Sequence, residues 1–239
     1  MSASLQALIL AAGRGTRLAG EADRPKCLLE LGSSTLLDRY LQVLTRRDVP
    51  VTVVTGHAAD RIDQHVHRWT GVQTVRNPRF TEGSIVSLAR GLEAVRGPLL
   101  LLDGDVCFHP ALLERLIDTT VSDALLVDLG TDFTGEEYLA GVDSGRVTAL
   151  RRGPVPGHEA HGEWVGFARL SATTVEALQT AITAQIAQGA THGGYEDALS
   201  GLLDAVPVHA IAVDGLAWVE IDFPHDLARA QALVATGRV

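Results

Sequence analysis

Lysine is nearly absent from this chain. Lys26 is the one lysine among the 20 lysines and arginines of its 239 residues. Acidic residues are more numerous, so the formal net charge is −9 at pH 7. Affinity for a polyanion comes largely from clustered Lys and Arg side chains that neutralise phosphates. The composition therefore argues against general nucleic-acid binding.

Cysteines and long apolar runs are scarce as well. The two cysteines, Cys27 and Cys107, provide no disulfide framework and fit a reducing compartment. Apolar runs stay well short of the roughly 18 residues of a membrane span. Residues 1–10 also lack the basic start and the cleavage site of a signal peptide. We therefore expect a cytoplasmic protein with no membrane partner.

The first half of the chain alternates short apolar runs with helical patterns. A helix with apolar residues on one face is expected at 35–47, with Ser34 as its N-cap. Strands are expected at 5–11, 51–56, 72–77 and 98–106, and further helices at 58–68 and 84–95. Such alternation is typical of an α/β fold with a parallel sheet and helices on both faces.

The second half has a different pattern. The tripeptide Asp143-Ser144-Gly145 predicts a tight turn between two short strands, and hence a small antiparallel extension of the sheet. Strands are expected at 123–129, 138–143, 146–151, 163–170, 207–213 and 217–221, and helices at 172–188, at 195–205 and from Pro224 onward. No linker interrupts the chain, and its 46% apolar composition can fill one substantial core. We expect a single domain over residues 1–239.

A glycine-bearing loop, Gly13 to Arg17, follows the first predicted strand. Its glycines allow close backbone approach, so successive N–H groups can point at a polyphosphate. Two common nucleotide-binding fingerprints are not matched, because position 18 is Leu and Lys26 is followed by Cys27. Lys26 itself is a compact ammonium that can follow phosphate oxygens as their geometry changes. Its position just after the loop suggests phosphate chemistry.

Asp103 and Asp105 end the apolar run LLLLDGDV, which has the composition of a strand buried on both faces. Ligands of open parallel sheets lie beyond the carboxyl ends of the strands, where the Gly13 loop is also expected. Two carboxylates at the tip of a buried strand repel one another unless a cation lies between them. Mg²⁺ is such a cation, since it takes one or two carboxylates together with phosphates and waters.

The longer pattern L-A-A-G-x-G-x-R-L, a spacer, P-K and L-L-E-L resembles the nucleotidyltransferase superfamily that joins NTPs to sugar phosphates and small phospho-alcohols. The closing WVEIDFPHDLARA is similar to that family's last strand-to-helix segment. The resemblance implies a Rossmann-like, mixed and mainly parallel sheet of the nucleotide-diphospho-sugar transferase type. It also implies nucleotide binding by the loop residues Leu10, Ala11, Ala12, Gly13, Arg14, Gly15, Thr16 and Arg17.

The same resemblance assigns roles to the charged residues. Arg17 would contact the β- and γ-phosphates, and Lys26 would reach the α-phosphate. Asp105 and Asp222 would bind Mg²⁺, with Asp103 as a neighbour of the nucleotide that orients Asp105. Asp222 is alternatively the N-cap of a helix that starts at Pro224. Asp226 is better placed to serve that helix N-terminus.

The segment NPRFTEGSIVSLARGL resembles the part of small cytidylyltransferases that reads the pyrimidine, with Ser87 as the match. This implies CTP as the nucleotide. Ser84 also belongs to the segment, either as a nucleotide-binding residue or as the N-cap of the helix that begins there.

For the acceptor, the chain most resembles CTP:phosphocholine and CTP:phosphonate cytidylyltransferases. Arg152 would hold phosphonate oxygens with its planar fork. Glu196 and Asp197 would attract an ammonium group, although acids on a helix surface are an equal alternative. Trp164 could face a choline group. An aromatic content of only 5% favours a smaller acceptor, such as 2-aminoethylphosphonate or a hydroxyalkyl phosphonate.

The sequence thus predicts a Mg²⁺-dependent cytidylyltransferase for a small phosphonate or phospho-amino-alcohol. Residues 1–120 would bind the nucleotide and residues 121–239 the acceptor. A sugar-1-phosphate nucleotidyltransferase and a nucleotide-binding regulator without turnover are the alternatives. A homodimer is compatible with these patterns.

Overall fold

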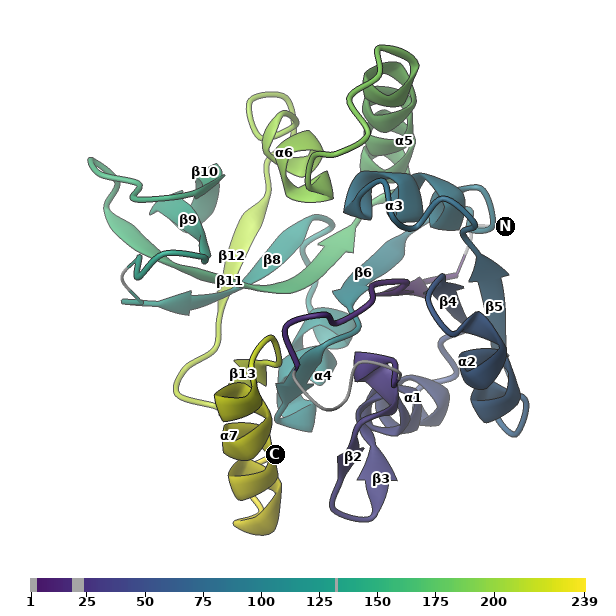
Figure 1. Cartoon of the computed structure of the whole chain (residues 1–239). Coiled ribbons are helices and arrows are strands. Elements are labelled where there is room, and N and C mark those ends of the chain that lie inside the picture. Colours follow the sequence, from purple (N-terminus) through teal and green to yellow (C-terminus); the bar gives the residue numbers. More distant parts are fainter. Residues whose placement is uncertain (1–3, 19–23, 132) are drawn as a thin grey trace.

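A nine-stranded sheet forms the centre of the protein in the computed structural model, which describes residues 4–18, 24–131 and 133–239 (Figure 1). The strand order is β5-β4-β1-β6-β11-β8-β12-β10-β9. Four neighbouring strands of the first half run parallel: β1 (Gln6–Ala11), β4 (Val51–Thr55), β5 (Val72–Arg76) and β6 (Leu99–Asp103). The predicted mixed α/β class and the parallel strands of the first half are confirmed.

The second half adds five strands to the same sheet: β8 (Ala124–Leu129), β9 (Tyr138–Asp143), β10 (Arg146–Arg152), β11 (Ala160–Leu170) and β12 (His209–Ala212). The long strand β11 pairs antiparallel with β6, β8 and β9. The antiparallel part is therefore larger than the small extension that the sequence predicts. Residues 144 and 145 form the expected turn between β9 and β10.

Helices cover both faces of the sheet, because alternate side chains of each buried strand point to opposite sides. In β1, Ala7 and Ile9 enter one apolar cluster, whereas Leu8 belongs to the other. The first cluster packs against α1 (Leu36–Arg46), α2 (Ala59–Val66), α4 (Pro110–Asp118) and α7 (Pro224–Ala235). The second packs against α3 (Ser84–Leu92), α5 (Ala172–Ala187) and α6 (Tyr195–Ser200). Figure 1 shows α3, α5 and α6 together on one side of the sheet.

Two small antiparallel pairs lie outside the central sheet. One joins β2 (Glu30–Leu31) to β3 (Ser34–Thr35), after the short 3-10 helix η1 (Lys26–Leu28). The other joins β7 (Val106–Phe108) to β13 (Trp218–Glu220). The second pair connects the end of β6 with the segment that leads into α7.

Three details of the helices differ from the sequence prediction. The N-cap of α1 is Thr35 and not Ser34, because the Thr35 hydroxyl accepts the Asp38 N–H while the Asp38 carboxylate accepts the Thr35 N–H. Gly83 rather than Ser84 precedes α3 as its N-cap. Helix α4 was not predicted, although Pro110 stands at its first position and the His109 ring accepts the Ala111 N–H.

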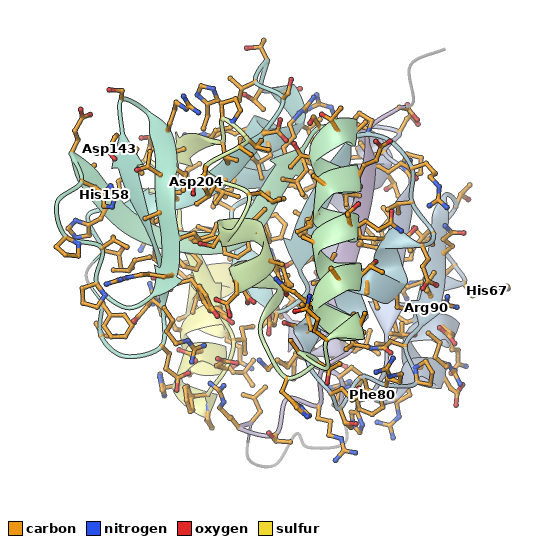
Figure 2. The ribbon with its side chains drawn as sticks, turned by 90° about the horizontal axis from the view of Figure 1, so that it is seen from above. His67, Phe80, Arg90, Asp143, His158 and Asp204 are labelled. Atoms are coloured by element: carbon orange, nitrogen blue, oxygen red, sulfur yellow. The ribbon has the colours of Figure 1, made fainter. Side chains whose placement is uncertain are left out.

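Residues 1–120 and residues 121–239 contribute strands to opposite ends of the sheet. Seen from above in Figure 2, Asp143 and His158 lie together near the β9–β10 hairpin, far from His67 and Arg90 of the first half. His158 Nδ1 is 2.8 Å from an Asp143 carboxylate oxygen, which ties the segment after β10 back to the hairpin. None of the described helices has the length and apolar character needed to cross a bilayer.

Candidate active site

Asp105 and Asp222 are brought together by the β7–β13 pair. Val106 lies opposite Glu220 in this ladder, and the Ile221 N–H donates to the Asp105 carbonyl at 2.9 Å. The residues just before β7 and just after β13 must therefore lie side by side. This register explains how two acids from distant parts of the sequence share one site.

The turn that carries Asp105 is fixed from below by Tyr40 of α1. The Tyr40 hydroxyl lies 2.6 Å from the Asp103 carbonyl and 2.7 Å from the Val106 carbonyl, and it accepts the Val106 N–H at 3.1 Å. Gly104 lies against β1, since a Cβ atom there would be 2.6 Å from the Leu10 carbonyl oxygen. The turn is thus held by contacts that a side chain at position 104 would disrupt.

The Lys26 side chain contacts the carboxylates of both Asp105 and Asp222. Its ammonium lies 2.9 Å from Asp105 Oδ2 and 2.5 Å from Asp222 Oδ1, and its side chain is only 15% exposed. Burial alone would lower the pKa of Lys26, but the two carboxylates outweigh it and raise that pKa. The lysine is therefore charged at neutral pH.

Gly15 makes room for this lysine. It has φ +61°, which an L side chain rarely adopts, and a Cβ atom there would lie 2.9 Å from Lys26 Cγ. Leu18, 2% exposed, anchors the far end of the same loop in the core. The glycine loop and Lys26 are thus packed against each other.

A third carboxylate, Glu220, belongs to the group and was not predicted. Each of Asp105, Glu220 and Asp222 offers a carboxylate oxygen, and these oxygens all lie within 4.8 Å of one another. Water still reaches Glu220, but protein surrounds it closely enough that desolvation, together with Asp105 and Asp222, raises the pKa of Glu220 to about 8. The signal was available in the sequence, because residues 220 and 222 are two apart on an extended segment and so share a face.

This donor set fits a hard divalent cation. All three groups offer carboxylate oxygens, which Mg²⁺ and Ca²⁺ prefer, and carboxylates this close repel one another without positive charge. The Lys26 ammonium supplies that charge in the structure.

Arg17 contacts the same group from the end of the glycine loop. One guanidinium nitrogen lies 2.9 Å from Asp222 Oδ2 and 2.6 Å from Glu136 in the loop between β8 and β9. The guanidinium carbon also lies 5.4 Å from the centre of the Phe223 ring. Arg17 therefore links the first half of the chain to the second across the mouth of the site.

Asp222 does not cap α7. The Asp226 carboxylate accepts the backbone N–H groups of Asp222 and Phe223, at 3.1 and 2.8 Å. Asp226 thus serves the helix N-terminus, as predicted, and the Asp222 carboxylate is left to contact Lys26 and Arg17.

A cavity of about 480 Å³ extends from this group toward β9–β11. Arg152 and Trp164 line it, as does Glu196, whereas Asp197 is exposed and not part of the lining. Carboxylates dominate its charged lining: Asp103, Asp128, Glu136, Glu137, Glu163, Glu196, Glu220, Asp222 and Asp226 against Arg152 and Arg229. The cavity therefore favours a ligand with positive charge.

Asp103, which lines the cavity, is bound by the buried Tyr195. The Tyr195 hydroxyl donates to Asp103 Oδ1 at 2.9 Å, and the Tyr195 N–H donates to Ser84 Oγ at 3.1 Å. Burial and the nearby Asp105 carboxylate raise the pKa of Asp103 well above its usual range. Asp103 is thus turned toward Tyr195 rather than toward Lys26.

The predicted acceptor residues have distinct environments. Trp164 is buried, donates its indole N–H to the Phe167 carbonyl at 3.0 Å, and meets Tyr195 edge to face. The Arg152 guanidinium lies over the Tyr138 ring at 5.4 Å. Burial raises the pKa of Glu196, whose buried Oε2 has no hydrogen-bond partner. The Oε2 atom of Glu196 can therefore accept a hydrogen bond from a ligand.

Glu163, a second acid of the cavity that the sequence analysis did not select, lies on β11. Burial and the neighbouring Glu137 and Asp128 carboxylates raise the pKa of Glu163 to about 7. The alternating pattern of β11 places it on the same side as Val165, which also lines the cavity.

The two serines that the sequence assigned to the nucleotide are not equivalent. Ser87 is 5% exposed and accepts the Asn77 side-chain N–H at 2.9 Å beneath α3. Ser84 is exposed at the start of the helix. Of the residues predicted to bind the nucleotide, Leu10 and Ala11 are the last two of β1, and Ala12, Gly13, Arg14, Gly15 and Thr16 follow them. The Arg14 guanidinium lies 5.5 Å from the centre of the Phe80 ring, labelled in Figure 2 at the edge of the first half.

Comparison with known proteins gives matches over most of the chain. Residues 7–181 match the profile of the family described as MobA-like NTP transferase domain. The chain is 37% identical over 117 residues to the bifunctional protein GlmU of Synechococcus elongatus, which is 48% of this chain and 25% of GlmU. It therefore spans about a quarter of the length of that curated relative.

Two solved structures share the fold. The CTP:phosphocholine cytidylyltransferase of Streptococcus pneumoniae matches with a TM-score of 0.80 at 20% identity, over 96% of this chain and 99% of that one. The inositol-1-phosphate CTP transferase of T. maritima matches with a TM-score of 0.75 at 18% identity, over 97% and 96%. At these identities the likeness shows a common fold.

Proposed function

Because the chain belongs to the family of MobA-like NTP transferase domains, we propose that it is a Mg²⁺-dependent cytidylyltransferase. It would join CTP to a small phosphonate or phospho-amino-alcohol and give the CMP-linked product and pyrophosphate. The observation that carries the proposal is the contact of the Lys26 ammonium with both Asp105 and Asp222 beside the glycine loop.

The proposed reaction needs no covalent intermediate with a protein side chain. An acceptor oxygen, already anionic at neutral pH, attacks the α-phosphorus of CTP in line, and pyrophosphate leaves with the electrons of the broken P–O bond. No general base is required. Lys26 and Arg17 stabilise the negative charge that develops on the phosphates, and the loop backbone orients them. Mg²⁺ held by Asp105, Asp222 and Glu220 would supply further charge neutralisation.

The nucleotide and the acceptor would be bound by different halves of the chain. Residues 1–120 carry the loop, Lys26 and Ser84 and would hold the nucleotide. Residues 121–239 carry most of the acidic cavity and would hold the acceptor. Of the serines, the exposed Ser84 is the better candidate for a direct nucleotide contact, and Ser87 would act by holding Asn77.

The acceptor is proposed from the charges of the cavity. Glu196, with its unpaired buried oxygen, would accept from an ammonium group, and a cation bound near Glu163 would favour the ionised form of that carboxyl. Arg152, which lies over the Tyr138 ring near Glu196, would hold phosphonate oxygens. Trp164 presents little exposed ring for an aromatic cage. The charges support 2-aminoethylphosphonate, and the small exposed ring of Trp164 supports either it or a hydroxyalkyl phosphonate over phosphocholine, with Asp197 acting only at long range.

A second candidate is a nucleotidyltransferase for a sugar 1-phosphate. The shared fold with an inositol-1-phosphate CTP transferase favours it, since that protein's name gives a ring 1-phosphate as its substrate. The acidic cavity favours an acceptor with a cationic group instead, because the carboxylates that line it would gain no ionic contact from an uncharged ring.

Pyrophosphate release tests the proposal. Four NTPs are crossed with 2-aminoethylphosphonate, a hydroxyalkyl phosphonate, phosphocholine and glucose 1-phosphate, each with Mg²⁺. The proposal expects turnover with CTP and an acceptor from the first three, and none in Asp105→Asn. Faster turnover with glucose 1-phosphate supports the second candidate. Tight CTP binding by calorimetry without pyrophosphate release for any pair contradicts both and indicates a regulator.

A further inference from the structure

Both oxygens of Asp222 are occupied by side-chain cations. Oδ1 contacts the Lys26 ammonium at 2.5 Å and Oδ2 contacts Arg17 at 2.9 Å. The Lys26 ammonium also contacts Asp105 Oδ2 at 2.9 Å. A divalent cation bound by Asp222 would share these oxygens with the two side chains, and at Asp105 it would lie beside the Lys26 ammonium. The ammonium and the metal therefore compete for the negative charge of these carboxylates.

We propose that Lys26 is the internal counter-cation of the metal carboxylates before substrate arrives, so that the site binds a divalent cation weakly until a nucleotide triphosphate takes over the ammonium. Competition between Lys26 and the metal rests only on the contacts above. The release of Lys26 by a nucleotide rests on the proposed function.

The surroundings hold the ammonium at this point. The Lys26 side chain is 15% exposed and those of Asp105 and Asp222 are 26% and 25% exposed, so water screens these contacts less than on an open surface. The stem of the lysine packs against Gly15, where a Cβ atom would leave too little space. With the ammonium in place, the charges of the carboxylates are partly neutralised by the protein's own side chain.

Binding of the nucleotide and binding of the metal are then thermodynamically coupled. A triphosphate that draws Lys26 and Arg17 toward itself raises the metal affinity of the carboxylates, and a bound metal raises the nucleotide affinity by the same factor. Metal without nucleotide would bind poorly, and so would nucleotide without metal.

Electron paramagnetic resonance of Mn²⁺ tests the competition without turnover. Free Mn²⁺ is measured in titrations of the wild type, Lys26→Met and the control Arg24→Gln, without nucleotide. Arg24 is also a cation, but it pairs with Glu30 at 2.8 Å. We expect Lys26→Met to bind Mn²⁺ at least ~10-fold more tightly than the wild type, since one positive charge is removed from beside the ligands. Arg24→Gln should match the wild type, and Lys26→Met/Asp105→Asn should lose the gain.

The wild-type chain offers a second measurement that needs no variant. Because Lys26 is the one lysine, lysine labelled with ¹³C and ¹⁵N gives a single side-chain ε signal. Titration with Mg²⁺ should move this signal, and CTP should lower the Mg²⁺ concentration required.

Equal Mn²⁺ affinity in Lys26→Met and Arg24→Gln overturns the inference, as does an ε signal that saturating Mg²⁺ leaves in place. A tighter site in Lys26→Met combined with no response of the wild type to CTP supports the counter-cation and contradicts the proposed nucleotide. The two failures are thereby distinguished.

Discussion

The hydroxyl of Tyr40 accepts the backbone N–H of Val106 at 3.1 Å, in the interior of the protein. Tyr40 belongs to α1, whereas Val106 begins the strand β7 that pairs with β13. This contact holds the turn that carries Asp105, which the pairing of β7 with β13 places beside Asp222. A core residue thus supports the geometry of the candidate active site.

Tyr40→Phe removes this contact and leaves buried backbone groups of the turn without a partner. We expect a loss of about 1–3 kcal/mol in the free energy of unfolding. Turnover should fall as well, because the turn that carries Asp105 gains freedom. Urea unfolding and pyrophosphate release measure the two effects. Unchanged turnover in a destabilised variant would show that the turn does not depend on Tyr40.

Asp105→Asn keeps the shape of the side chain but removes a charge from the carboxylate group. We expect a folded protein whose turnover is at least ~100-fold lower. The variant would hold Mg²⁺ less well, and the phosphates would lose the charge stabilisation that this ion supplies. Asp60→Asn is the matched control, since Asp60 is 92% exposed and pairs with Arg76 on the surface. A similar loss in both variants would argue against a special role for Asp105.

Gly15→Ala should displace Lys26. The added Cβ atom would lie 2.9 Å from Lys26 Cγ, and φ at this position is +61°. We expect turnover to drop ~10-fold or more, with a cost to folding of about 1 kcal/mol. Gly201→Ala serves as the control, because its Cβ atom would meet neighbours at ordinary distances of 3.5 and 3.6 Å. A fully active Gly15→Ala would contradict the packing of Lys26 against the loop.

The stability of α1 should depend on pH through Asp38. Burial opposes ionisation of Asp38, but hydrogen bonds from Thr35, Arg68 and His65 outweigh it and lower the pKa of Asp38. The stabilisation is therefore present above the unfolded pKa of about 3.9 and is lost as pH falls further toward the folded value.

Urea unfolding of the wild type and Asp38→Asn checks this dependence. We expect the wild type to be more stable by about 1–2 kcal/mol at pH 6, where the N-terminal cap of α1 is intact. The difference should shrink between pH 4 and the lowest pH at which both proteins fold. A difference that stays constant over that range would exclude the Asp38 carboxylate as its source.

The parts of the structure that the sequence predicted are those with a local signal. Strand β1 is an apolar run, and the glycine loop shows the spacing Gly13, Gly15 and Arg17. Lys26 stands out because it is the one lysine of the chain. Helix α4 had such a signal too, in Pro110 and the apolar pattern that follows, and was still missed. The choice of Ser34 as a cap was wrong because the capping box needs an acid three residues later, which only Thr35 has.

Other features depend on contacts between distant segments, which no local pattern encodes. Glu220 and Asp222 are neighbours by local spacing, but the two meet Asp105 only because β13 pairs with β7. Glu136 meets Arg17 only because the loop after β8 crosses the mouth of the site. The burial of Ser87 follows from Asn77, which lies at the end of β5 and holds it from beneath α3.

A crystal structure with Mn²⁺ and a non-hydrolysable CTP analogue tests the central claim most directly. The account predicts an anomalous peak about 2.1 Å from oxygens of both Asp105 and Asp222, and the Lys26 ammonium on a phosphate oxygen of the analogue. An analogue bound away from the glycine loop, or an anomalous peak that neither carboxylate contacts, would contradict it.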